Sequence, residues 1–371
     1  MNAQHKLWSN NLILEGRTGY GFLINHHLEM KIYNAHYPSF EINLGKETDG
    51  RERWQTMYSY PTIGAAFWYS HMGNSDFLGS AYAVFPYVNY PLLKGEKSSF
   101  NFRLGLGLGY LTKRFTRLEN YKYIAIGSHL NAAVNLSFEY RYHITNRLSV
   151  ATSFTMIHFS NGSTKTPNFG VNSPSLNLAL AYKLSKPNPF LNKKLLPGLY
   201  KFEFDGSKSL DYTLGFTAAY KDMGNTYGKK FMIYNGTGSV YLPVSFKSSV
   251  GVGFDLTNDG SDKYTADKNE IEYRSTLDLL RLGVTANYRL SMSKLTYHGG
   301  VGYYLYAKVR PKPSYYKFSI QYDITPNIYA GITLRTHFAE ADFVGFGGGV
   351  KFDYFYLNKH RHNERKGKEV F

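Results

Sequence analysis

Two polar residues, His158 and Ser160, carry the clearest chemical signal in this sequence. They follow a run from Leu148 to Met156 in which every second residue is apolar or Thr. Alternate residues of a β-strand share one face and lie two strand rises apart, about 7 Å. His158 and Ser160 therefore continue the apolar face of this predicted strand. A histidine next to a hydroxyl is the combination that supplies a general base and a nucleophile.

The chain then turns back into a second predicted strand. Leu176 to Tyr182 alternates in the same way, and stepping back by twos through Pro174 brings Asn172 onto the apolar face. We predict a β-hairpin whose tip lies between His158 and Asn172. On a neighbouring strand, Asn172 is placed to hold the imidazole in one tautomer.

The predicted hairpin tip also supplies candidate groups for stabilising a negative charge. Backbone amides in this loop could donate hydrogen bonds to an oxyanion, and the candidates are Asn161, Gly162, Asn168 and Gly170. The alternative interpretation is structural, because His, Ser and Asn are all common at strand ends and turns. A short His-X-Ser motif does not by itself decide between the two.

The composition indicates an all-β chain. It has 371 residues, with 34 Tyr, 26 Phe and 35 Gly. Aromatic residues favour strands, whereas Gly marks turns and crowded barrel interiors. No apolar run approaches the roughly 18 residues of a membrane-spanning helix. Strands that alternate lipid-facing and lumen-facing residues need no such run, so we predict a transmembrane antiparallel β-barrel.

The stretch 131–143 is the clearest example of this alternation. The apolar residues Ala132, Val134, Leu136, Phe138, Tyr140 and Tyr142 share one face, and Asn135, Ser137, Glu139 and Arg141 share the other. The aromatic residues gather towards one end of the run. This distribution is typical of the aromatic girdle of a membrane barrel.

The alternating runs number about sixteen, eight before residue 184 and eight after residue 202. One of the later runs is Thr276–Leu290. The predicted organisation is a half with the candidate site (1–184), a linker containing Pro187-Asn188-Pro189 (185–201), a second half (202–358) and a basic tail (359–371). The strands form either one closed barrel or two eight-stranded barrels in tandem. We favour one barrel, because fused halves can share edges and leave none exposed.

The second half is predicted to be a diverged copy of the first without the site. Ile144-Thr145-Asn146 leads to His158, and Ile324-Thr325-Pro326-Asn327 leads to His337, but the second interval is one residue shorter. Because a shift of one residue exchanges the two faces of a strand, His337 should face the lumen. No Ser follows it two residues later.

The charge and the ends of the chain bear on partners and compartment. A formal charge of +16 is compatible with nucleic acid, but the basic residues are dispersed apart from the tail between Lys359 and Lys368. Attraction to anionic lipid headgroups suits an aromatic-rich barrel better. The absence of cysteine excludes disulfides and thiolate metal sites. No signal peptide is visible at Met1–His5, and we expect a mature sequence with an added Met.

Other motifs are weaker. His26, His27, His360 and His362 are candidate metal ligands, but they lack converging partners and are expected in solvated segments. Gly345, Gly347 and Gly349 imitate a phosphate-binding loop. They alternate with apolar residues, so we predict lumen positions of a strand and no nucleotide site.

Residues 158–182 resemble the lipid A 3-O-deacylase family of outer-membrane barrels. That family has His, an aromatic residue, Ser and Asn, followed by Pro-Asn-X-Gly and an acidic residue, and the matching residues here are His158, Phe159, Ser160, Asn161, Pro167, Asn168 and Gly170. The resemblance covers about residues 10–184. It implies a serine esterase in the bacterial outer membrane that removes the 3-hydroxyacyl chain ester-linked to lipid A of lipopolysaccharide, without a cofactor.

One position departs from the family pattern, because Asn172 stands where the family has Glu. An amide oxygen can orient a histidine but lacks the charge that stabilises imidazolium. The alternative function is a non-catalytic pore or scaffold, since sixteen strands in one ring leave room for a channel. A pore has no use for His, Ser and Asn on its lipid side, where polar groups are costly, so we favour the esterase. The oligomeric state is left open.

Overall fold

The computed structural model of this chain describes residues 11–24, 28–185, 210–224, 229–309, 312–338 and 340–353. Several sequence predictions lie outside these residues. They concern Met1–His5, the candidate ligands His26, His27, His360 and His362, almost all of the linker 185–201, the start of the second half at 202 and the basic tail 359–371.

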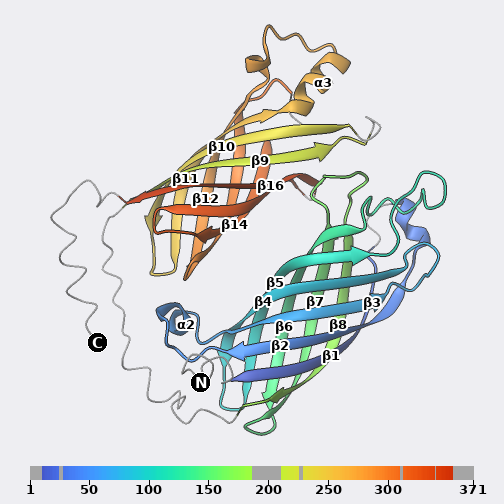
Figure 1. Cartoon of the computed structure of the whole chain (residues 1–371), viewed down its shortest axis with the longest axis vertical. Helices are drawn as coiled ribbons and strands as arrows, with labels where there is room; N and C mark the ends of the chain where they lie inside the picture. Colours follow the sequence, from blue (N-terminus) through green and yellow to red (C-terminus); the bar gives the residue numbers. More distant parts are fainter. Residues whose placement is uncertain are drawn as a thin grey trace, which may run out of the picture. The chain divides into compact units, whose positions relative to one another are not determined.

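The first barrel is closed and consists of eight strands hydrogen-bonded in chain order (Figure 1). All its pairings are antiparallel. Its strands are β1 (Leu12–Phe22), β2 (His36–Glu47), β3 (Thr62–His71), β4 (Ser80–Lys94), β5 (Ser98–Leu111), β6 (Leu130–His143), β7 (Leu148–Ser160) and β8 (Val171–Lys183).

The second barrel is a separate closed set of eight antiparallel strands. Its strands are β9 (Asp211–Asp222), β10 (Lys230–Pro243), β11 (Ser248–Asp259), β12 (Arg281–Met292), β13 (Leu295–Tyr306), β14 (Ser314–Asp323), β15 (Ile328–His337) and β16 (Glu340–Asp353). The prediction of an all-β antiparallel barrel protein with sixteen strands is confirmed.

The preference for a single sixteen-stranded barrel is wrong. β1 pairs with β8, with Ile13 opposite Lys183, and β9 pairs with β16, with Ala219 opposite Gly345. Each half therefore satisfies the backbone groups of its own first and last strands. Closure within each half removes the exposed edges that were the reason for expecting a shared ring.

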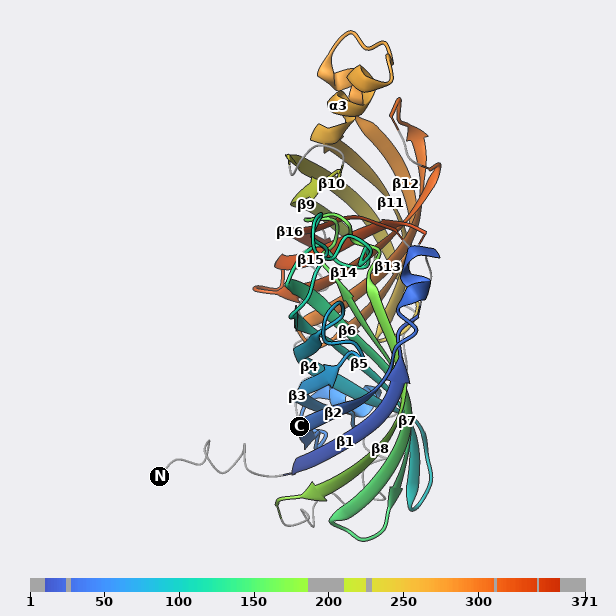
Figure 2. The same cartoon turned by 90° about the vertical axis from the view of Figure 1, so that its right-hand side faces the viewer.

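The described residues include four short helical segments between strands, and the sequence pattern predicted none of them. They are η1 (Leu28–Ile32), α2 (Arg53–Met57), α3 (Gly260–Lys268) and η3 (Thr276–Leu279). Because η3 occupies 276–279, the strand predicted from Thr276 begins only at Arg281. The Asp259 side chain caps α3 by accepting from the Ser261 amide, and α3 extends beyond the strand ends (Figures 1 and 2). None of the helices in the described part of the chain is long and apolar enough to cross a membrane.

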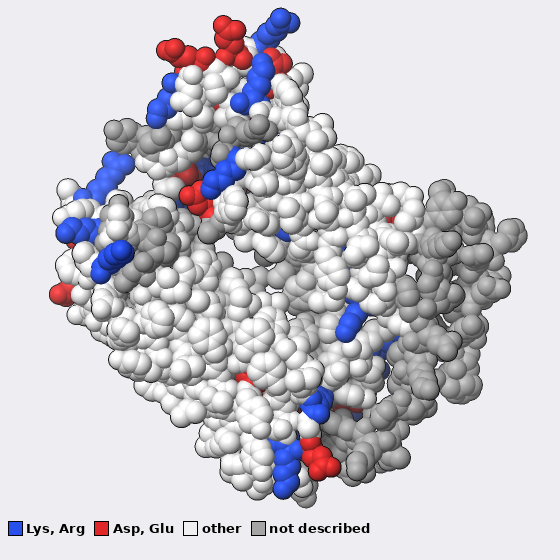
Figure 3. Space-filling view, turned by 180° about the vertical axis from the view of Figure 1, so that it is seen from behind, with Lys and Arg blue, Asp and Glu red and all other residues white. Residues whose placement is uncertain are grey.

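The outer faces of the strands are apolar, as the alternation predicted. On β8, Leu176, Leu178 and Leu180 are 68%, 66% and 56% exposed, whereas the residues between them are buried. On the face seen in Figure 3, Lys, Arg, Asp and Glu are sparse along the barrel walls and gather mainly near strand ends and loops. An apolar wall with charges at its ends is the surface that a bilayer requires.

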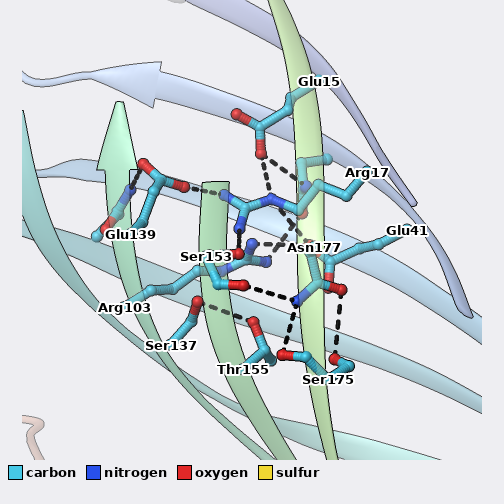
Figure 4. Close-up of polar contacts among 12 residues, drawn as sticks. Glu15, Arg17, Glu41, Arg103, Ser137, Glu139, Ser153, Thr155, Ser175 and Asn177 are labelled. Atoms are coloured by element: carbon cyan, nitrogen blue, oxygen red, sulfur yellow. Dashed lines mark hydrogen bonds and ion pairs between the residues drawn. The ribbon is translucent and has the colours of Figure 1, made fainter. Parts of the chain in front are cut away.

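Charged side chains fill the lumen of the first barrel (Figure 4). Arg17 pairs with Glu15 and Glu139, and Arg103 pairs with Glu41 at 2.7 Å. All five residues are buried. Each buried charge has an opposite partner, so the network replaces the water that would otherwise solvate these groups. The lumen at this level is a packed interior.

The lumen of the second barrel also contains ion pairs, such as Lys317 with Asp255 at 2.7 Å, and tyrosine rings pack over its glycines. A Cβ on Gly302 would lie 2.1 Å from the Tyr315 ring, so only glycine fits beneath that ring. The Tyr315 hydroxyl donates to Asp255 at 2.7 Å. His337 is also inside the barrel, with its Nε2 at 3.2 Å from the Tyr304 hydroxyl. The predicted lumen position of His337 is confirmed.

One turn is built identically in the two barrels. The Thr145 hydroxyl accepts from the Leu148 amide at 2.9 Å before β7, and the Thr325 hydroxyl accepts from the Ile328 amide at 3.0 Å before β15. This repeated geometry supports the predicted relationship between the two halves.

Candidate functional site

His158 and Asn172 lie directly opposite each other where β7 pairs with β8. His158 Nδ1 is 2.6 Å from Asn172 Oδ1. The amide oxygen can only accept, so Nδ1 carries the proton and Nε2 keeps the lone pair that a general base needs. Both side chains are on the outer face of the barrel and are partly exposed.

Ser160 is two residues beyond His158 on the same outer face, and the amide of Asn168 lies against its hydroxyl. Asn168 Nδ2 is 3.0 Å from Ser160 Oγ, and Oδ1 is 3.3 Å from it. The amide N–H of Asn161 donates to the same Oδ1 at 3.0 Å. This bond requires an acceptor, so the NH₂ group of Asn168 is the side that offers its protons next to Ser160.

Gly170 is the position where the loop passes closest to the imidazole. Its φ is +86°, and a Cβ built on it would lie 2.6 Å from His158 Cε1. Both facts require glycine, because an L side chain rarely adopts this φ and would collide with the ring. The loop backbone therefore packs directly against the imidazole of His158.

The hairpin loop is tied to the loop between β5 and β6 (112–129). Asn161 Nδ2 donates to Ser128 Oγ and to the Lys165 carbonyl, both at 2.8 Å, and the Gly170 amide donates to the Ala125 carbonyl at 2.8 Å. The backbone amides of Asn161 and Gly170, two of the candidate oxyanion donors, are thus already engaged. Asn161 and Gly170 act here by fixing the loop.

Beneath the site the lumen is tightly packed. Phe159 points inward between His158 and Ser160 and is fully buried. Its ring lies 5.8 Å from the Trp68 ring, centroid to centroid. A Cβ on Gly109 would be 2.4 Å from the Phe159 ring. This packing holds the end of β7 and limits the movement of its two outward side chains.

The surface beside Ser160 is apolar and contains one small residue. Ala132 on β6 lies directly opposite Ser160, and Leu108 on β5 lies opposite Ala132. Leu108 is 63% exposed on the same outer face. Val134 pairs with His158, so the strip next to the two polar residues is lined by aliphatic side chains.

The remaining candidates do not form sites. Gly345, Gly347 and Gly349 lie within β16 as predicted, and a Cβ on Gly345 would contact Thr217 and Ala219 inside the second barrel. Gly162 adopts φ +61° in the hairpin loop. Within the described ranges no three His, Asp or Glu side chains are grouped to hold a metal ion.

Sequence reasoning missed the second loop of the site. Ala125, Ser128 and Ala132 lie 28 to 45 residues before the residues that they approach in space. No local spacing links Ser128 to Asn161. The only available signal was the alternation in 131–143, which places Ala132 on the outer face.

Two closed barrels with apolar walls define an outer-membrane β-barrel protein. Residues 39–181 match the family model of lipid A 3-O-deacylase (PagL), and residues 208–354 match that of the acyloxyacyl hydrolase C-terminal domain. The first barrel is thus similar to the lipid A 3-O-deacylase family. The predictions of family and of bacterial outer-membrane localisation are confirmed.

The solved structures that match are distant in sequence. A crystal structure of the outer membrane enzyme PagL is 17% identical, with 44% of this chain and 97% of that chain covered and a TM-score of 0.33. A mutant of Rh. blastica porin is 9% identical, with 92% and 99% covered and a TM-score of 0.18. No curated protein matches the sequence.

Proposed function

We propose that this protein is an outer-membrane serine esterase that removes an ester-linked 3-hydroxyacyl chain from lipid A. The observation that carries the proposal is the hydrogen bond between His158 Nδ1 and Asn172 Oδ1 beside Ser160 on the lipid-facing surface. The family match of the first barrel supports the substrate class. A hydrolase of lipid A esters needs its nucleophile at the outer face of the barrel, because the substrate is part of the membrane.

His158 is the proposed general base and Ser160 the nucleophile. Ser160 Oγ attacks the ester carbonyl while His158 Nε2 takes its proton. The resulting imidazolium returns that proton to the sugar oxygen as the carbon–oxygen bond breaks, which leaves an acyl group on Ser160. Water, deprotonated by His158, then releases the hydroxy fatty acid and restores the serine. Asn172 keeps the imidazole in the required tautomer throughout.

Asn168 is the proposed oxyanion donor. Its NH₂ group lies next to Ser160 Oγ, and its orientation is fixed by the Asn161 amide. A preoriented donor next to the nucleophile stabilises the charge that develops on the carbonyl oxygen, and one such donor typically contributes 10²–10³-fold in rate. The scheme needs no cofactor. Asn161, Gly162 and Gly170 support the loop that presents Asn168.

The apolar strip around Ala132 is the proposed binding surface for the acyl chain. Ala132 leaves space opposite Ser160, and Leu108 and Val134 continue the aliphatic surface. An acyl chain lying there stays in the hydrocarbon region while its ester reaches the end of β7.

Mass spectrometry of lipid A tests the proposal. Cells that express the protein should yield lipid A lighter by one 3-hydroxyacyl group, and cells that express Ser160→Ala should not. The competing function is a non-catalytic pore or scaffold. An unchanged acylation pattern across several lipid A structures, with the protein folded in the outer membrane, would favour that alternative. The packed lumen of the first barrel argues against a channel there.

A further inference from the structure

Arg114, in the loop between β5 and β6, is held only by neutral groups. Its Nε donates to His129 Nε2 at 3.1 Å and its Nη1 donates to the Gly127 carbonyl at 3.5 Å. In the part of the chain that the structure describes, no carboxylate lies within ion-pair distance of this guanidinium. Arg114 is partly buried. A partly desolvated cation without an acid beside it favours the approach of an external anion.

His129 is fixed in the tautomer that can hold this arginine. Its Nδ1 is 2.8 Å from the Leu111 carbonyl and must donate to it, so Nε2 has the lone pair that accepts from Arg114. The ring stacks on Tyr110, with centroids 5.7 Å apart and planes at 20°. His129 therefore orients the guanidinium without neutralising its charge.

Short contacts connect Arg114 to the candidate site. A Cβ on Gly127, whose carbonyl accepts from Arg114, would lie 2.7 Å from the Thr166 carbonyl in the hairpin loop. The adjacent Ser128 accepts from Asn161 at 2.8 Å. Along the chain, His129 is three residues before Ala132, the residue opposite Ser160. The guanidinium thus belongs to the loop that braces the catalytic hairpin.

The loops at this end of the first barrel carry an excess of positive charge. In the sequence, residues 23–35, 72–79, 112–129 and 161–170 contain six basic and three acidic residues. The basic residues are Lys31, Lys113, Arg114, Arg117, Lys122 and Lys165, and the acidic ones are Glu29, Asp76 and Glu119. An anionic substrate is attracted towards such an end.

We propose that Arg114 binds a phosphate group on the glucosamine of the lipid A substrate and that His129 is its positioning residue. The proposal rests on the esterase function and extends it to substrate recognition. Arginine offers a planar pair of N–H donors that fits phosphate, which lysine cannot reproduce. Binding the phosphate at the loop would place the neighbouring acyl ester of the same sugar at Ser160.

The test compares full-length protein acting on lipid A in detergent micelles with the same lipid A after chemical removal of its phosphates. Arg114→Gln should raise KM for the phosphorylated substrate about 10-fold or more, as expected for loss of a hydrogen bond to a charged group. Its kcat should change less than about 2-fold. Arg114→Lys should be intermediate. His129→Phe, which keeps an aromatic ring for Tyr110 but loses the acceptor, should raise KM several-fold.

Arg147→Gln is the matched control. Arg147 lies in the turn at the other end of β7, is partly exposed like Arg114, and has the Tyr182 hydroxyl as a side-chain partner at 3.4 Å. Its substitution should leave KM unchanged. An Arg114→Gln protein whose KM rises equally on both substrates, or on neither, would overturn the proposal.

A binding measurement distinguishes failure of the phosphate assignment from failure of the esterase proposal. In the Ser160→Ala background, binding is measured to micelles that contain phosphorylated lipid A, dephosphorylated lipid A or phosphatidylglycerol. Arg114→Gln should weaken binding of phosphorylated lipid A alone. Equal weakening with phosphatidylglycerol would mean a general headgroup anchor and would refute the substrate assignment. If the parent protein hydrolyses neither substrate, the esterase proposal fails, and the binding measurement still decides whether Arg114 binds the phosphate.

Discussion

The two barrels share a strand plan but differ at the end of one hairpin. β7 and β8 are joined by a ten-residue loop, 161–170, whereas β15 and β16 are joined by residues 338 and 339 only. The longer loop brings Asn168 to Ser160 and Gly170 to His158. In the second barrel the corresponding histidine, His337, is turned into the lumen against Tyr304. A shared scaffold therefore specifies no activity, since the site depends on which face each side chain occupies and on the loop that reaches it.

The strongest test of this difference between the barrels is to remove one histidine from each. His158→Ala and Ser160→Ala should each lower turnover by at least about 10³-fold, because base and nucleophile act as one unit. His337→Ala should leave turnover within about 2-fold of the parent protein. The measurement is release of hydroxy fatty acid from lipid A, with heat-modifiable mobility in gel electrophoresis as the test of folding. A comparable loss in His337→Ala would contradict the division of roles.

The next test concerns the residue that orients His158. Asn172→Glu should keep or raise turnover, because a carboxylate opposite Nδ1 stabilises the imidazolium that forms during the reaction. Asn172→Ala should lower turnover about 10–10²-fold. The rates are measured at neutral pH with the same assay. Turnover that survives Asn172→Ala unchanged would place the orienting group elsewhere.

Two glycine substitutions test whether turnover depends on the close packing of the Gly170 backbone against His158. Gly170→Ala should reduce turnover by up to about 10²-fold, since its Cβ would meet His158 Cε1 at 2.6 Å and displace the imidazole. The control is Gly16→Ala in β1, where nothing lies within 4 Å of an added Cβ. Gly16→Ala should leave turnover unchanged. Similar rates for the two variants would show that the ring tolerates movement.

The smallest change in activity is expected for a substitution in the apolar strip around Ala132. Ala132→Leu fills the space opposite Ser160 and should lower kcat/KM about 10-fold, with less effect on shorter acyl chains. Val150→Leu, on the outer face near the other end of β7, is the control and should change little. The ratio of kcat/KM values for long and short acyl chains is the readout. A ratio that Ala132→Leu does not alter would place the acyl chain elsewhere.

The sequence predicted the outward position of His158, Ser160 and Asn172 because the period of a strand is two and the alternation on β7 and β8 is unbroken. It predicted the lumen position of His337 by the same rule. It left one ring and two rings both open and wrongly favoured one, because alternation specifies which face a residue occupies and not which strands close on each other. The sequence also could not predict the hydrogen bonds of Ser128 and Arg114. Loops have no periodicity, and these bonds depend on how segments distant in the sequence pack together.

The hydrogen bond between His158 and Asn172 spans only 14 residues of chain. In kinetic terms, a contact of such low sequence separation can form as soon as one hairpin folds, before β1 meets β8. The base and its orienting residue therefore come together within one hairpin, and the rest of the first barrel, with the loop 112–129 that fixes the hairpin tip, holds them at the membrane surface. Grafting residues 158–172 between β15 and β16, in the register that turns the histidine outward, is the most economical route to a second active centre on this molecule.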